Sequence, residues 1–237
     1  MEKRQRKMND FFQNSVFFGV MVSILTYGAG MMLQKKFRLA VFNPLLISII
    51  LTILVLVTAH IDYKTYYASA KYLSYLLTPA TVCLAIPLYE RIEELKKNWK
   101  AVLAGISSGV LTSLCSILVM AAFFHLSHKE YVTLLPKSIT TAIGMGVSQE
   151  LGGYVTLTVA VIIITGILGN IFAETICRMF HISEPVAKGV AIGTASHAIG
   201  TARAMTMGET EGAMSSLSIA VAGLLTVIGA SVFAQFM

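Results

Sequence analysis

Long apolar segments separated by short polar turns run along most of this chain. Five of these segments carry no charged residue. Each has the roughly 20 mostly apolar residues that a helix needs to cross a bilayer. The pattern therefore predicts clean membrane spans over residues 11–34, 39–59, 101–124, 151–173 and 212–237.

A further apolar segment, residues 72–89, is interrupted by proline. Pro79 has no backbone N–H and disfavours helical geometry at the preceding residue, Thr78. We therefore expect a kinked or discontinuous helix here, with Thr78 and Thr81 at the break.

Two other segments are rich in small and hydroxyl-bearing residues and too polar to face lipid throughout. Small residues let backbones approach closely, and hydroxyls can satisfy backbone groups freed from a helix. In residues 189–207 this composition predicts a broken or re-entrant helix with its break at residues 194–201. A tightly packed interfacial helix with a snorkelling arginine is the alternative. In residues 134–153 we expect a half-helix that begins near Pro136 and ends at Gly152 and Gly153.

These segments together predict an all-α polytopic membrane protein with about six full spans plus broken or re-entrant helices. A broken segment followed by a clean span occurs at 72–124 and again at 184–237, and residues 141–168 share several identities with 201–228. Paired interruptions in two halves favour an inverted-repeat transporter-like fold. We expect one integral membrane domain over residues 1–237, with a basic tail (1–10), a first half (11–124) and a second half (130–237).

Composition agrees with a membrane protein. Of the residues, 56% are hydrophobic and 13% are charged, against about 25% charged in soluble domains. The net charge of +6 comes from short basic clusters at the edges of apolar segments, where lipid headgroups attract them, so we expect no nucleic-acid partner. Two basic loops, residues 35–38 and 91–100, outweigh the basic first seven residues and favour an external N-terminus. Cys83, Cys115 and Cys177 lie in apolar segments without metal-ligand spacing, as packing residues do.

The sequence carries no nucleotide-binding, zinc-protease or serine-hydrolase motif. Ser196 and His197 are adjacent, and adjacent residues on a helix point about 100° apart, so they cannot readily form a nucleophile–base pair. We therefore expect no enzyme, no cofactor and no metal site.

Anion recognition is the chemistry that the polar residues favour. Arg203 can grip a carboxylate through a bidentate fork, Lys137 can act as a point charge, and His197 can exchange a proton near neutral pH. Hydroxyls of the half-helices and breaks complete the predicted site: Ser138, Thr140, Thr141, Thr194, Ser196 and Thr201, with Thr78 and Thr81. Two alternatives stay open. Lys137 can reach lipid headgroups, and His197 can be a packing residue.

Two spacings predict contacts between helices. Glu174 and Arg178 lie four positions apart on one helix face and can pair. Gly105 and Gly109 have the spacing of a close-packing face, which would allow a homodimer.

Three motifs in order resemble the LrgB/CidB family of bacterial membrane proteins, which has a plant relative in the plastid glycolate/glycerate translocator. They are PATVCLAIPLY at 79–89, LPKSITT at 135–141 and GTASHAIGTA at 193–202. The resemblance covers nearly the whole chain from about residue 39 onward.

The resemblance implies a protein of the bacterial plasma membrane and two functions. One is a holin- or antiholin-like role in murein hydrolase activity, lysis and programmed cell death, with a small LrgA/CidA-type membrane partner. The other is transport of a small carboxylate such as pyruvate or glycolate. A carboxylate carrier needs internal broken helices and a buried arginine, whereas a holin-like pore needs neither. The residues therefore favour a monocarboxylate carrier, with proton coupling through His197.

Overall fold

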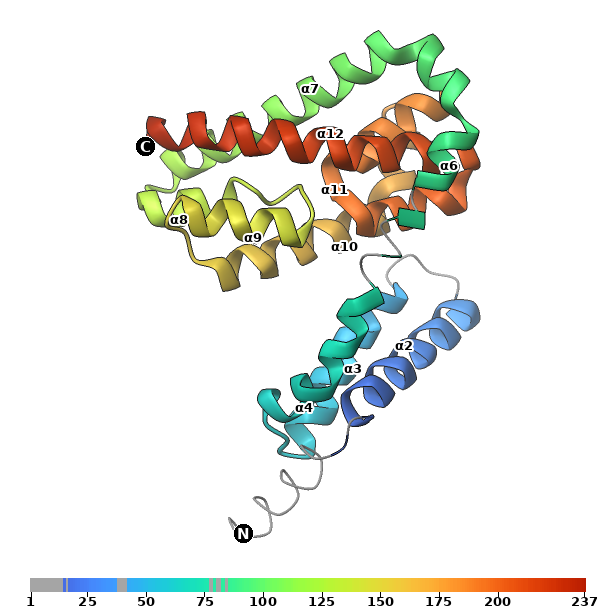
Figure 1. Cartoon of the computed structure of the whole chain (residues 1–237), viewed down its shortest axis with the longest axis vertical. Coiled ribbons are helices and arrows are strands. Elements are labelled where there is room, and N and C mark those ends of the chain that lie inside the picture. Colours follow the sequence, from blue (N-terminus) through green and yellow to red (C-terminus); the bar gives the residue numbers. More distant parts are fainter. Residues whose placement is uncertain (1–14, 16, 38–41, 77–78, 80–81, 84) are drawn as a thin grey trace. The chain divides into compact units, whose positions relative to one another are not determined.

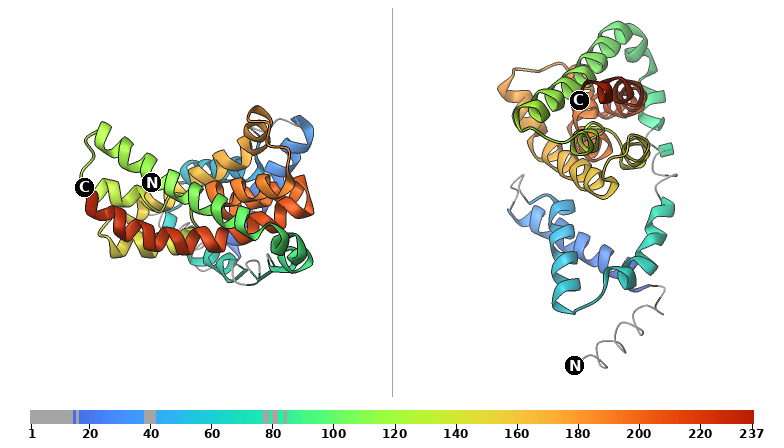
Figure 2. Two further views of the ribbon diagram at one scale, coloured as in Figure 1. Left: turned by 90° about the horizontal axis from the view of Figure 1, so that it is seen from above. Right: turned by 90° about the vertical axis from the view of Figure 1, so that its left-hand side faces the viewer.

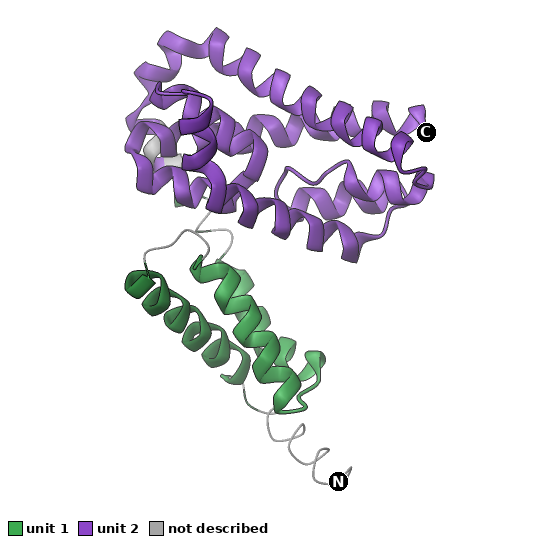
Figure 3. Ribbon diagram, turned by 180° about the vertical axis from the view of Figure 1, so that it is seen from behind, with its two compact units in different colours: residues 1–83 green, residues 84–237 purple. Residues whose placement is uncertain are grey.

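The computed structural model describes residues 15, 17–37, 42–76, 79, 82–83 and 85–237, and its regular elements there are all helices. The chain forms two compact units, residues 1–83 and 84–237 (Figure 3). The boundary falls inside the proline-interrupted segment 72–89. The expectation of a single membrane domain stays a prediction.

The first unit consists of α2 (Phe18–Phe37), α3 (Pro44–Thr58), α4 (Tyr63–Ala70) and the 3₁₀ helix η1 (Lys71–Leu76). Asn43 caps α3, because its side-chain oxygen accepts from the amides of Leu45 and Leu46 at 2.9 and 3.2 Å. Thr26 joins α2 to α3 through hydroxyl contacts with Ser48 (3.1 Å) and Thr52 (3.0 Å). At 15 residues, α3 is shorter than the span predicted over 39–59.

The second unit contains seven described α-helices and a short 3₁₀ helix. The long helices α11 and α12 pack along each other, with α10 against α11 and α7 against both (Figures 1 and 2). The elements are α6 (Ala85–Glu90), α7 (Ile92–Phe123), α8 (His128–Leu134), α9 (Thr141–Glu150), α10 (Val155–Met179), α11 (Pro185–Met207), α12 (Glu209–Phe233) and η2 (Ala234–Phe236).

A stripe of aliphatic residues on α7 forms one side of the core of this unit. Its members recur every three or four residues, so they share one helix face. They form one core cluster with residues of α12 that include Ala213, Met214, Ala222 and Ala230. The buried stripe is Val102, Ile106, Val110, Leu114, Ile117 and Ala121.

Three helices in the described part of the chain are long and apolar enough to cross a membrane: α7, α10, and α12 together with η2. They confirm the all-α membrane fold class and the apolar segments 101–124, 151–173 and 212–237. The predicted number of about six spans is not confirmed.

Two helix boundaries differ from the prediction. Residues 92–100 of the segment expected as a charged loop form the first turns of α7, where Glu93 and Glu94 suit the positive end of the helix dipole. The half-helix α9 begins at Thr141 instead of near Pro136, because the backbone at Thr140 is still extended (φ −63°, ψ 147°). Its predicted end is confirmed. Gly152 follows it with φ +79°, a conformation that favours glycine.

Histidine ends three helices in the same way. His60, His125 and His181 follow α3, α7 and α10 in the left-handed region, with φ of 51°, 53° and 55°. The next residue is aliphatic each time, and its amide closes the last turn, as in a Schellman motif. The hydrogen bonds are Ile61 N to Leu56 O (2.9 Å), Leu126 N to Ala121 O (2.9 Å) and Ile182 N to Cys177 O (2.8 Å).

Candidate functional site

Helix α11 is broken at Ser196 and His197, inside the range predicted from its small and hydroxyl-bearing residues. Ser196 has φ −135° and ψ 15°, and His197 has φ 43° and ψ −145°. A residue other than glycine is strained in the second conformation, and such residues gather at functional sites. The predicted discontinuous helix is thus a feature of the structure.

Helix α10 holds the break in place. His197 is 2% exposed, and its Nε2 lies 3.0 Å from the carbonyl oxygen of Ile162. The Asn170 side-chain amide donates to the carbonyl of Ile199 at 2.7 Å. Gly166 leaves room for the imidazole, since a Cβ there would lie 2.8 Å from its Cε1 atom. These contacts favour packing for His197, and its role in proton exchange stays a prediction.

A cavity of about 620 Å³ lies between α7, the first half of α11 and the turn before α9. The two helices run parallel along it. A Cβ on Gly105 would lie 3.1 Å from Val190 Cγ1, and one on Gly109 would lie 2.7 Å from Thr194 Cγ2. The middle of the cavity is apolar, lined by Ala101, Val102, Val186, Ala187, Val190 and Ala191, and its far end carries Asn98 and Glu184.

The near end of the cavity gathers a cation and several hydroxyls. Lys137 Nζ donates to Ser138 Oγ at 2.9 Å, and Ser138 contacts Ser113 Oγ at 3.2 Å. Burial lowers the pKa of Lys137, which lies in the turn before α9. Thr194 is 6% exposed, and its Oγ1 is a buried side-chain oxygen without a hydrogen-bond partner among the described residues. A buried hydroxyl left unpaired is costly. The Thr194 methyl group faces Gly109 of α7, and the oxygen itself has no surface open to the cavity.

Arg203 is elsewhere, on the second half of α11. Its Nη2 lies 2.8 Å from Glu174 Oε1 on α10, and among the described residues it is not part of the cavity lining. Glu174 therefore pairs with Arg203, and the expected pair with Arg178 on its own helix is not the one formed. Lys137 lines the cavity and Arg203 does not, so the two residues do not share one site. The guanidinium of Arg203 is also already paired with the carboxylate of Glu174. Its role as a carboxylate ligand stays a prediction.

The other predicted hydroxyls divide among several places. Ser196 is buried and donates to the Ile192 carbonyl at 3.1 Å. Thr201 contacts Ser215 Oγ at 2.7 Å, which joins α11 to α12. Thr140 and Thr141 are half-buried at the start of α9, outside the cavity lining. Thr78 and Thr81 lie outside the described residues.

Sequence reasoning missed the contribution of α7. The hydroxyls Thr112, Ser113 and Ser116 line the cavity on the same face as Gly105 and Gly109. The spacing of these hydroxyls and of the two glycines is the available signal, but the sequence prediction places the glycines at a dimer interface. In the structure the glycines pack against α11 of the same chain, so this face is not free to form the predicted homodimer.

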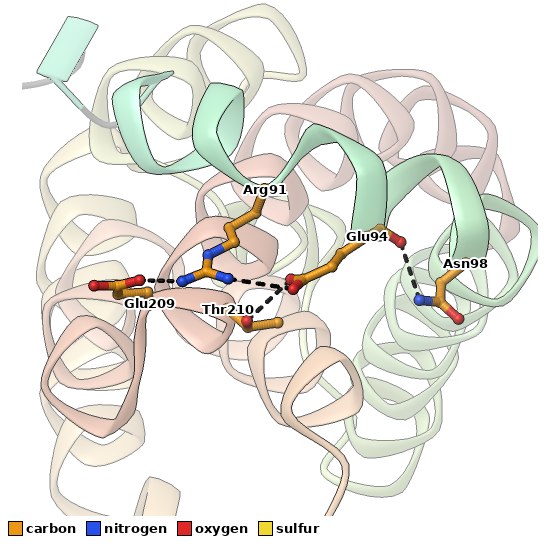
Figure 4. A network of polar contacts seen from close by, with 5 residues as sticks. All are labelled: Arg91, Glu94, Asn98, Glu209 and Thr210. Atoms are coloured by element: carbon orange, nitrogen blue, oxygen red, sulfur yellow. Dashed lines mark hydrogen bonds and ion pairs between the residues drawn. The ribbon is translucent and has the colours of Figure 1, made fainter.

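A polar network joins the start of α7 to the start of α12 (Figure 4). Arg91 contacts Glu209 on α12 and Glu94 on α7, the latter at 3.3 Å. Thr210 donates to Glu94 Oε2 at 3.0 Å, and Asn98 donates to the Glu94 carbonyl at 3.0 Å. Asn98 also lines the cavity, so the network borders its far end.

Comparison with known proteins identifies the family of this membrane protein. The model of the LrgB-like family matches residues 23–236. The chain belongs to the LrgB-like family. The match begins well before residue 39, so α2 is largely part of the family pattern. Proteins named antiholin-like protein LrgB from Bacillus cereus strains B4264 and AH187 and from Bacillus anthracis strain CDC 684 / NRRL 3495 are each 34% identical over 93% of this chain and 96% of their own length. No solved structure matches the chain. This LrgB-like chain is a protein of the bacterial membrane.

Proposed function

We propose that this LrgB-like protein has an antiholin-like role in the bacterial membrane, where it restrains permeabilisation and the wall autolysis that follows. The observation that carries this proposal is the 34% identity to antiholin-like relatives over 93% of the chain. The long apolar helices α7, α10 and α12 support a membrane location.

Lysis timing tests this role. The chain is produced in bacterial cells together with a holin, and we expect lysis to start later than with the holin alone. Membrane-fraction immunoblots control for insertion. An unchanged lysis time with the protein fully inserted would contradict the role.

A second candidate function is translocation of a small monocarboxylate, and the cavity beside the broken helix favours it. Lys137 supplies a positive charge, and Ser138 and Ser113 supply hydroxyls. A small LrgA/CidA-type partner and proton coupling belong to this proposal. Transport of an acid would also affect lysis, because a change in acid export would change autolysis of the cell wall indirectly.

Uptake into proteoliposomes tests the carrier. We expect saturable uptake of labelled glycolate or pyruvate, lost by at least about tenfold in Lys137→Met, because a desolvated ion pair contributes more than about 1.4 kcal/mol. Lys137→Arg keeps the charge and should retain uptake. Lys100→Met is the matched control, since Lys100 is exposed on α7 and outside the cavity lining. Equal loss in both Met variants would show that the effect is not specific to the site.

A further inference from the structure

The cavity is much larger than a two- or three-carbon acid requires. Its 620 Å³ falls within the roughly 300–1,000 Å³ of pockets for drug-sized ligands. The cavity is open on one side, where Ala101, Ala187 and Ala191 are exposed. A short acid would therefore fill only the end next to Lys137.

The lining changes character along the cavity. Because α7 and α11 run parallel, the polar end at Thr194 and Ser113 is followed by apolar residues down to Val186. From Thr194 to Val186 the helix rises about 12 Å. Glu184 then places a negative charge at the far end.

We infer that the cavity binds a single-chain carboxylate with a medium-length apolar tail, held by its carboxylate at Lys137 and Ser138 and by its tail along Val186, Ala187 and Val190. This inference rests on the second proposed function and names the ligand class of that site. Each methylene buried in the apolar part strengthens binding by about fourfold. Glu184 repels a second carboxylate at the tail end, so the monoacid binds better than the diacid of equal length.

The test is equilibrium binding of labelled decanoate, decanedioate and pyruvate to the full chain in phosphatidylcholine nanodiscs, with empty nanodiscs as background. We expect decanoate to bind at least about 100-fold more tightly than pyruvate, and more tightly than decanedioate. Lys137→Met should abolish this binding and Lys137→Arg should retain it.

A substitution that fills the apolar part of the cavity tests the contribution of the ligand's apolar tail separately from that of its carboxylate. Ala187→Leu places a larger side chain about 10 Å along the helix from Thr194. It should weaken decanoate binding by about tenfold and leave pyruvate within about twofold. Ala202→Leu is the matched control, because Ala202 is exposed on α11 and outside the lining.

The outcomes separate this inference from the proposed function. Pyruvate binding as tight as decanoate, unchanged in Ala187→Leu, would overturn the inference and leave the carrier standing. No binding of any acid would overturn both. Loss of decanoate binding in nanodiscs that contain phosphatidylglycerol would identify the cavity as a phospholipid site and overturn the inference.

Discussion

His125 shows how much a single backbone position can matter in this protein. It ends α7 in the left-handed region at φ 53°, where an L-residue is disfavoured by about 1–2 kcal/mol. Glycine adopts this conformation freely, but it also gains entropy in the unfolded chain.

We predict that His125→Gly raises the free energy of unfolding by about 0.5–1 kcal/mol, measured by urea denaturation in detergent. His128→Gly is the matched control. His128 starts α8, and its Nδ1 lies 2.6 Å from the carbonyl oxygen of Met237, so this variant should lose stability. A decrease in both variants would contradict the strain assigned to His125.

At the scale of elements, the packing of α7 on α11 depends on Gly109. A Cβ there would lie 2.7 Å from Thr194 Cγ2. We predict that Gly109→Val destabilises the protein by about 1–3 kcal/mol through overpacking and weakens anion binding because the added side chain narrows the cavity that Gly109 lines. Thermal denaturation and the binding assay measure the two effects.

Gly146→Val provides the control for Gly109→Val. Gly146 lies on α9 and has no atoms within 4 Å of the position that its Cβ would take. Valine has a higher helix propensity than glycine, so this variant should keep or slightly raise the melting temperature. Equal destabilisation of the two variants would argue against close packing at Gly109.

Helices and breaks that depend on local amino-acid composition could be predicted from the sequence. Charge-free length predicted α7, α10 and α12, and small and hydroxyl-bearing residues predicted the break at Ser196. The start of α7 was not predictable, because residues such as Glu93 and Lys97 suit an exposed helix face as well as a loop. The pairing of Arg203 with Glu174 was not predictable either, because it joins two different helices and the residue spacing within one helix does not indicate such a contact.

At the scale of the second unit, the network around Arg91 joins the starts of α7 and α12 (Figure 4). Its groups are accessible to water, so its attraction is screened by salt. We predict that Arg91→Gln lowers the melting temperature at low ionic strength and that the difference from wild type shrinks in about 1 M salt, where the Debye length is about 3 Å.

Lys96→Gln is the control for Arg91→Gln. Lys96 is exposed on α7 and is not part of the network drawn in Figure 4. Its replacement by glutamine therefore removes one positive charge and leaves the network intact. Its melting temperature should stay close to wild type at both salt concentrations. A salt-independent loss in Arg91→Gln would point to packing of the arginine stem instead of its charge.

The break in α11 also determines how this region opens over time. Residues 185–195 and 198–207 form two helical pieces joined by a non-helical pair. Local opening follows cooperative units of structure, and amide hydrogen exchange reports each unit separately. The first piece, along the cavity, and the second, along α12, can therefore exchange their amides at different rates, so that a ligand in the cavity slows exchange in one piece and leaves the other unchanged.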